Sequence, residues 1–262
     1  MATLALDLTK SIDENAAVYF ERAKKIKKKI EGAKTALDEN LQKLRQLEQK
    51  KEKAAAKSQE LGIRDERKRE WYEKFRWFRS SEGFLVIGGR DATSNEVVIK
   101  KHTDSDDLVL HTDMAGSPFF VIKSEGRQIG EKTKEEAADA TCTFSKAWKL
   151  GLASTSVFYV KPEQVSKKTK SGEYMGKGAF MIYGKTNYMP NNISLAIGMS
   201  KSFQIMAGPP DAIKASCEKY VILQQGNEKS SSVAKYILHK IGGSVDEIIR
   251  ALPSGGVKVK KE

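Results

Sequence analysis

The sequence predicts an α+β protein, with an N-terminal α-helical coiled-coil hairpin followed by a mainly antiparallel-sheet domain with flanking helices. In residues 13 to about 60, apolar residues recur at spacings of three and four, and no proline occurs before Pro118; this period is typical of a coiled coil. From Ser81 onward, short β-rich runs are separated by turn residues. Helical stretches are scattered among these runs, which favours α+β over a doubly wound sheet.

The first predicted element is one long helix from residue 13 to about 60. Asp13 or Ser11 can cap it, and Glu14 lies in its first turn, where a carboxylate suits the helix dipole. Its other faces are so polar that the seam needs a partner to be stable in water. The seam is strong to Leu47 and consists of Ala23, Ile26, Ile30, Ala33, Leu37, Leu44 and Leu47.

A second helix is predicted from Arg64 to Phe78, after a break at Gly62. The favoured arrangement folds it back on the first helix as an antiparallel hairpin, with the turn between about Lys51 and Gly62. One interrupted rod that pairs with another chain or domain is the alternative. The predicted domains are therefore a helical coiled-coil arm, 1–79, and an α+β domain, 80–262.

Aromatic residues crowd the end of the second predicted helix, where the arm meets the next domain. We expect them to lock the return helix to the sheet, and we expect Arg76 and Arg79 to flank that joint and face outward. The predicted joint residues are Trp71, Phe75, Trp77 and Phe78.

The α+β domain is expected to begin with four strands in quick succession, joined by short turns into an antiparallel meander. A helix over 132–150, capped by Thr133, follows. The predicted strands are 84–89, 96–102, 108–113, 118–124, 154–160, 178–184, 193–199, 202–208 and 219–225. The last helices are predicted from Pro210, over 231–241 and over 244–252.

Composition indicates a polyanionic partner in the cytoplasm. The net charge is +12, which favours RNA over other partners, although a solvated lysine-rich surface is the alternative. No run approaches the roughly 18 to 20 apolar residues of a membrane span, and the N-terminus lacks the pattern of a signal peptide. Cys142 and Cys217 lack metal-ligand spacing and are expected to be reduced, buried thiols in helices.

Two glycine-rich stretches resemble nucleotide-binding loops, but neither has the required spacing. The run Val86–Ala92 lacks Rossmann spacing and is expected to lead into another strand, and 172–178 lacks the P-loop pattern. No histidine has a second ligand at metal spacing, and no catalytic constellation can be assembled. We expect no enzyme activity, no cofactor, no metal and no small-molecule substrate.

Cations that alternate with an aromatic residue and glycines over 161–177 are typical of contacts to an RNA backbone and an unstacked base. For two other candidates a structural role is the alternative to RNA binding. Arg90 can pair with Asp91 or brace its turn, and His111 can be a structural histidine whose hydrogen bonds are satisfied within the fold. The predicted RNA-binding residues are Arg76, Arg79, Arg90, Lys100, Lys101, His111, Lys123, Lys146, Trp148, Lys149, Lys161, Lys167, Lys168, Lys170, Tyr174, Lys177 and Lys185.

Several long strings resemble the C-terminal NFACT-R domain of the NFACT proteins, which include the NEMF-type ribosome quality-control factors. These are "WYEKFRWFRSSEGFLVIGGRDATSNE", "HTDMAGSPFFVIK", "FSKAWK" and "PEQVSKKTKSGEYMGKGAFMIYGK". The stretch "LDLTKSIDENAAVYFERAKKIKKKIEGA" resembles the start of the family's coiled-coil segment, and the C-terminal tail looks most like archaeal members.

The resemblance implies a factor that binds the large ribosomal subunit when peptidyl-tRNA obstructs it. Full-length members recruit aminoacyl-tRNA and extend the stalled chain, and NFACT-R is regarded as their RNA-binding module. The family's N-terminal domain, where the tRNA-selecting residues reside, has no counterpart in this sequence. We therefore expect a binding component that does not direct tailing alone. The alternative is an adaptor whose coiled coil pairs with a separate N-terminal NFACT half.

Overall fold

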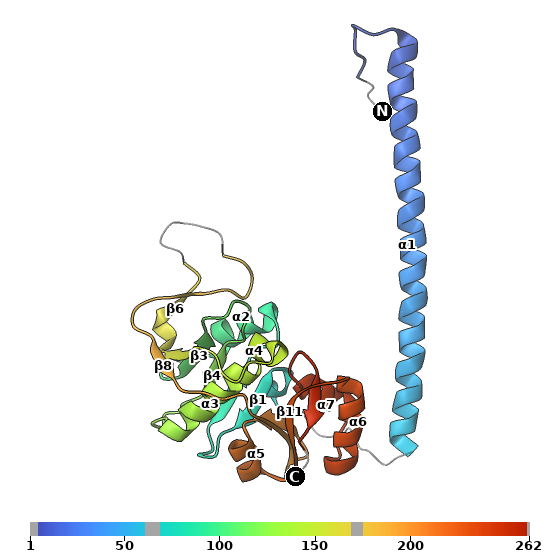
Figure 1. The fold of residues 1–262 in the computed structure, drawn as a ribbon. Helices are drawn as coiled ribbons and strands as arrows, with labels where there is room; N and C mark the ends of the chain where they lie inside the picture. The colour runs from blue at the N-terminus through green and yellow to red at the C-terminus, as the bar shows by residue number, and fades with distance from the viewer. Residues whose placement is uncertain (1–4, 61–68, 169–174, 261–262) are drawn as a thin grey trace. The chain divides into compact units, whose positions relative to one another are not determined.

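The computed structural model describes residues 5–60, 69–168 and 175–260, and for 49–60 it describes the helix without its side chains. The chain divides into two compact units, 1–67 and 68–262 (Figure 1). The α+β class is confirmed, because a long helix is followed by antiparallel sheets and shorter helices.

The first unit is built on one helix, α1 (Ile12–Glu60). Ser11 begins it as half of a capping box: its backbone N–H donates to Glu14 Oε2 over 2.8 Å, and the Glu14 N–H donates to Ser11 Oγ over 3.3 Å. The Asn15 side chain holds the preceding segment, since its Oδ1 accepts from the Asp7 N–H and its Nδ2 donates to the Asp7 carbonyl. Of the two predicted caps, Ser11 is therefore the one used.

The predicted return helix is wrong in the part of it that the structure describes. α1 continues through 51–60, where the turn was expected. Residues Trp71–Lys74 form a single 3-10 turn, η1, and Arg76–Arg79 form strand β1. The aromatic spacing that resembled a helix face arises because β1 is buried on both sides, so that consecutive residues Arg76, Trp77 and Phe78 are all inside. Residues 64–68 lie outside the described part.

The larger sheet of the second unit has the order β1-β2-β4-β3-β5-β8, and all its pairs are antiparallel. Because β1 pairs with β2, the second unit begins before the predicted domain boundary at residue 79. The other strands of this sheet are β2 (Leu85–Gly88), β3 (Leu108–Thr112), β4 (Phe120–Ile122), β5 (Val157–Val160) and β8 (Asn187–Met189).

A second antiparallel sheet has the order β10-β9-β11-β12. Its strands are β9 (Leu195–Ser200), β10 (Ile205–Gly208), β11 (Cys217–Glu228) and β12 (Val257–Val259). A short ladder pairs β6 (Val165–Ser166) with β7 (Met181–Ile182), after the 3-10 turn η2 (Pro162–Gln164).

Helices cover both sheets (Figure 1). α3 packs on β3, β4 and β5, α2 packs on β2, α5 on β9, α6 on β11 and α7 on β10. Their bounds are α2 (Ala92–Lys101), α3 (Glu131–Thr143), α4 (Lys146–Leu150), α5 (Pro210–Ser216), α6 (Ser230–Ile241) and α7 (Val245–Ala251).

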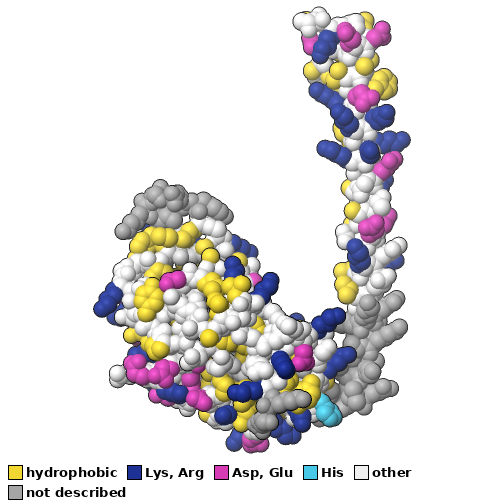
Figure 2. Space-filling view, viewed as in Figure 1, with side chains coloured by type: hydrophobic (Ala, Val, Ile, Leu, Met, Phe, Trp, Pro, Cys, Tyr) yellow, Lys and Arg dark blue, Asp and Glu magenta, His cyan; other side chains and the backbone are white. Residues whose placement is uncertain are grey.

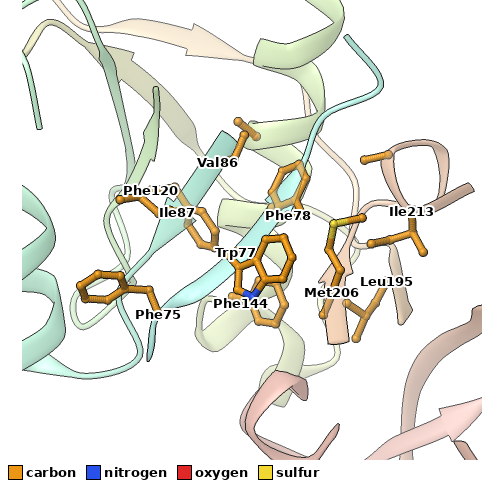
Figure 3. Packing of buried hydrophobic residues seen from close by; sticks show 14 of the residues in the cluster. Phe75, Trp77, Phe78, Val86, Ile87, Phe120, Phe144, Leu195, Met206 and Ile213 are labelled. Carbon is orange, nitrogen blue, oxygen red and sulfur yellow. The ribbon is translucent and has the colours of Figure 1, made fainter. Parts of the chain in front are cut away.

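The core lies where the two sheets meet, and β1 contacts β10 there. Phe78 and Met206 are both buried at this junction (Figure 3). A side chain at Gly208 would overlap the Phe78 ring, so this glycine permits the close approach of the two strands. Phe75, Trp77 and Phe78, which were predicted at an arm–domain joint, are all buried in the core of the second unit.

Other sequence predictions need correction at the level of single elements. The expected strand 96–102 is the helix α2, because Asp91 and Ser94 form a capping box that begins a helix. The expected helix 132–150 is two helices, since Ser145 caps a new helix after Phe144 and Gly130, not Thr133, is the first N-cap. Cys217 begins β11 and not a helix, although both cysteines are free and buried as expected. None of the described helices has the length and apolar character needed to cross a membrane.

Candidate nucleic-acid interface

A groove of about 400 Å³ in the second unit collects six of the predicted RNA-binding residues. Its lining comes mainly from the β2–α2 loop, the β3–β4 turn, α4 and the segment that leads to β7, together with single residues of β1 and β3. Its predicted residues are Arg76, Arg90, His111, Lys146, Lys149 and Lys177.

The β2–α2 loop is shaped by the buried Asn95. Its Oδ1 accepts from the Phe119 N–H over 3.1 Å, and its Nδ2 donates to the Ser117 carbonyl over 3.4 Å. A side chain at Gly89 would overlap Asn95, so the glycine there serves close packing. This clamp fixes the loop against the β3–β4 turn, and both line the groove.

The charge of the groove is strongly positive. Lys146, Lys149 and Lys177 have exposed side chains on its lining. The acidic residue on the lining is Asp91, whose carboxylate accepts from the Ser94 N–H over 2.8 Å. That hydrogen bond lowers the pKa of Asp91. The Asp91 carboxylate caps α2 and interacts favourably with the positive end of the helix dipole. The lysines therefore face the groove with little competing negative charge.

Arg76 and Arg90 lie together at the floor of the groove. Arg76 is 9% exposed; its Nη1 donates to the Leu252 carbonyl over 3.1 Å, and its guanidinium lies 4.3 Å from the Phe144 ring centre. Arg90 donates to the Arg250 carbonyl and to the Phe75 carbonyl, each over 2.9 Å. Burial, and then the charge of Arg90, lower the pKa of Arg76 to about 9. Both side chains still carry a positive charge at neutral pH.

Arg76 therefore does not face outward as expected, because β1 places it inside the sheet. The side-chain hydrogen bonds of Arg90 go to carbonyls near η1 and α7, and not to Asp91 or to its own turn. They do not neutralise its charge, since both acceptors are carbonyls.

Aromatic rings form one wall of the groove. The rings of His111 and Phe119 are stacked with centroids 4.0 Å apart, and Phe119 meets Phe180 edge-on at 5.4 Å. His111 Nε2 lies 3.2 Å from the Ser117 carbonyl oxygen. Burial is the largest cause of the lowered pKa of His111, which favours the neutral form of the ring. The structural alternative for His111 fits these contacts, although the ring also lines the groove.

Two predicted RNA-binding residues are buried in contacts of the fold and are not part of the groove lining. Lys123 is 8% exposed; its Nζ donates to Asp107 and, over 2.7 Å, to Asp104. Trp148 is 2% exposed, and its Nε1 donates to the Gly256 carbonyl over 3.0 Å. Residue type and local spacing indicated an RNA contact at both positions, but burial assigns them to the fold.

The other predicted cations lie outside the lining of the groove. Lys167 is half-buried; its Nζ donates to the Gly176 carbonyl over 3.0 Å and lies 4.7 Å from the Phe180 ring centre. Lys100 pairs with Glu96 over 2.5 Å. Those with exposed side chains are Arg79, Lys100, Lys101, Lys161, Lys168 and Lys185. Lys170 and Tyr174 lie outside the described residues.

Unit 1 presents the predicted coiled-coil seam without a covering element among its described residues. The exposed fractions are 57% for Ile26, 50% for Ile30, 59% for Leu37, 53% for Leu44 and 64% for Leu47. Lys and Arg side chains surround the seam on α1 (Figure 2). Ala23 and Ala33 are exposed as well.

Phe119 and Phe180, which complete the aromatic wall, were not among the predicted site residues. Their only sequence signal is a place at the edge of a predicted strand beside glycine or proline, and that pattern does not indicate a site. In the described part of the chain, no three His, Cys, Asp or Glu side chains are placed to hold a metal ion. Burial raises the pKa of Cys142 and of Cys217 to about 11, so neither thiol is a strong nucleophile at neutral pH.

Residues 74–184 match the family model described as the NFACT protein RNA binding domain. The archaeal Rqc2 homolog aRqcH of Methanocaldococcus jannaschii is 42% identical over 207 residues, which are 76% of this chain and 30% of that protein. The human ribosome quality control complex subunit NEMF is 36% identical over 196 residues, 73% of this chain and 18% of that protein. The chain thus spans less than a third of the length of these curated relatives.

A solved structure, the C-terminal part of the fibronectin/fibrinogen-binding protein from Streptococcus suis, matches with a TM-score of 0.38 and 19% identity. The match covers 50% of this chain and 49% of that chain. A likeness at this level supports no conclusion about function.

Proposed function

Because this chain belongs to the NFACT family, as an archaeal-like, NEMF-type member, we propose that it is a non-catalytic RNA-binding component of ribosome-associated quality control. In this proposal it binds the large ribosomal subunit, through ribosomal RNA, tRNA or both, on stalled complexes in the cytoplasm. Two of its relatives carry the names of ribosome quality control subunits. Neither those names nor the family description denotes an enzyme.

One observation supports this function above the others: the groove gathers five cations around an aromatic wall. Arg76, Arg90, Lys146, Lys149 and Lys177 come from four separate segments of the chain and line one surface. Cations that track phosphates, beside rings that can stack on bases, are the two components of RNA recognition.

Binding of the whole chain to purified large subunits and to tRNA tests this proposal. Each phosphate contact steepens the salt dependence by about 0.9 log units per decade for a duplex and about 0.7 for a single strand. Five contacts therefore give a slope between about −3.5 and −4.5. An affinity that stays flat between about 50 and 200 mM salt would refute binding through this charge.

The variant Lys146→Gln/Lys149→Gln ties the binding to the groove. Both side chains are exposed, so their loss costs the fold little, and the slope should become shallower by about 1.4 to 1.8. Lys201→Gln/Lys214→Gln removes the same charge from exposed positions in the β9–β10 turn and on α5. Equal weakening by the two variants would place the RNA elsewhere.

A second function, a protein-interaction adaptor, is favoured by the exposed seam on α1. Apolar side chains at a and d positions of a heptad that are half-exposed or more are suited to a second helix. In this alternative the partner is a separate protein that carries the N-terminal NFACT half, and the positive groove is incidental.

A further inference from the structure

The guanidinium pair at the floor of the groove lacks a counter-charge. Neither Arg76 nor Arg90 forms an ion pair with a carboxylate of the described residues; the charge of Arg90 acts on Arg76, and that of Arg250 acts on Arg90, where Asp91 offsets it only in part. Their hydrogen-bond acceptors are carbonyls of Leu252, Arg250 and Phe75. A buried charge is ordinarily paired, because an unpaired charge is costly to remove from water.

One buried donor of this pair is also unused. Arg90 Nε has no hydrogen-bond partner among the described residues, whereas buried N–H groups are nearly always satisfied. Arg90 Nε is itself enclosed, but Arg76 and Arg90 both line the groove, so an anion bound there can supply the missing counter-charge. Lys146 and Lys149 lie on the same lining and add to the attraction.

The aromatic wall on the same lining offers rings on which a flat ligand can stack. Phe180 is half-buried, and Phe119 supports it edge-on at 5.4 Å. The groove, at about 400 Å³, lies within the usual range for pockets that enclose a small ligand. Rings in such a pocket can stack on a base only when that base is out of the helical stack.

We propose that the groove binds one unpaired nucleotide of RNA, with its phosphate at Arg76 and Arg90 and its base against Phe180. This inference rests on the proposed function and deepens it, because it names the form of RNA that the groove takes. A double helix is recognised through backbone contacts over many base pairs, and it gives the aromatic wall nothing to bind. The groove therefore selects single-stranded segments, loops or ends.

The test measures the affinity of the whole chain for a fluorescent single-stranded RNA hexamer and for a blunt duplex of the same sequence. We expect Phe180→Leu to weaken hexamer binding roughly tenfold, as the loss of one stacked base does, and to leave the duplex unchanged. Phe203→Leu is the matched control, because it removes an exposed ring from the β9–β10 turn. Equal effects of the two variants on the hexamer would overturn the proposal.

If Phe180→Leu disturbs the fold, crosslinking of the unchanged chain provides a second test. A hexamer that carries 5-iodouridine is irradiated with the unchanged chain, and the crosslinked peptide is mapped by mass spectrometry. A crosslink at Phe180 or Phe119 supports the proposal, and crosslinks confined to other segments overturn it.

The two proposals fail in different ways. If large subunits are captured with the expected salt slope but the hexamer binds no better than the duplex, the unpaired nucleotide is wrong and the proposed function stands. If neither subunits nor tRNA are captured, the proposed function fails as well.

Discussion

Lys123 shows how one residue changes role between sequence and structure. From its place on a predicted strand, Lys123 was expected to contact RNA. In the structure its ammonium is buried between Asp104 and Asp107. It also donates to the His102 carbonyl over 3.1 Å. Asp107 has a side chain that is only 1% exposed, and its Oδ1 accepts from the Ser124 N–H. These contacts tie the loop between α2 and β3 to the end of β4.

Lys123→Met should therefore destabilise the protein and leave RNA binding intact. Removing the cation leaves the Asp107 carboxylate buried without its partner, which costs about 3 to 5 kcal/mol. Urea unfolding followed by tryptophan fluorescence measures the loss. Lys101→Met is the control, since Lys101 is exposed on the neighbouring helix, and it should change stability by less than about 0.5 kcal/mol.

Glu136 makes the stability of the protein depend on pH. Burial is the largest cause of its raised pKa; Oε2 accepts from the Ser81 N–H over 2.9 Å, and Oε1 has no partner among the described residues. The folded state therefore binds the Glu136 proton more tightly than the unfolded state. Its stability contribution is fully present below the unfolded pKa and is lost as pH rises through the folded value.

Glu136→Gln removes this penalty, because the amide is neutral at every pH. We expect the melting temperature to rise at neutral pH and to stay nearly unchanged at about pH 4, below the ordinary value of a glutamate. Thermal unfolding across this range measures both effects. A variant that gains the same stability at both pH values would contradict the explanation.

Among the elements, α3 depends on a cap from outside its own sequence. Its N-cap is Gly130, which has no side chain to offer. Glu82, in the β1–β2 turn, takes this role: its Oε2 accepts from the Thr133 N–H over 2.9 Å and from Thr133 Oγ1 over 2.5 Å. A side chain at Gly130 would overlap the Glu82 carboxylate, so the glycine makes room for the cap.

Glu82→Ala should cost about 1 kcal/mol, the usual effect of removing a cap. The change should appear first as faster amide exchange at the start of α3, because the first turn loses its acceptor. Hydrogen exchange with mass spectrometry measures it. Glu163→Ala, at an exposed position in η2, is the control, and equal exchange in both variants would rule out the cap.

Most strands and helices could be predicted because their signals are local. Short β-rich runs bounded by turn residues indicated β3, β4 and β5, and the heptad period indicated α1. The strand expected at 96–102 failed because β-branched residues outweighed a capping signal, the Asp91–Ser94 pair, that was present in the sequence. The return helix failed because β1 is covered on both sides, which removes the alternation that identifies a strand.

The candidate site could be predicted only in part for a related reason. Lysine and arginine were identified by type, and six predicted residues do line the groove. Type alone did not separate the exposed Lys177 from the buried Lys123, because that difference arises from contacts between distant segments. The partner rings Phe119 and Phe180 meet across 61 residues of sequence, and nothing local indicates their contact.

For the molecule as a whole, the two proposed functions use different units and can be separated. The seam of α1 lies in unit 1, and the groove lies in unit 2. Ile30 and Leu37 are 50% and 59% exposed, so Ile30→Asp/Leu37→Asp removes little buried surface from the chain itself. We expect this variant to lose any helical partner, because two charges in a heptad seam prevent its packing.

Tryptophan fluorescence shows whether unit 2 survives this change. Trp71, Trp77 and Trp148 are the three tryptophans of the chain, and all lie in unit 2. Their unfolding midpoint should match the unchanged chain, and the salt slope for RNA should stay the same, because no groove cation is altered. Loss of RNA binding in this variant would mean that α1 carries the nucleic-acid contact. Capture of a helical partner that persists in the variant would show that the seam is not the adaptor surface.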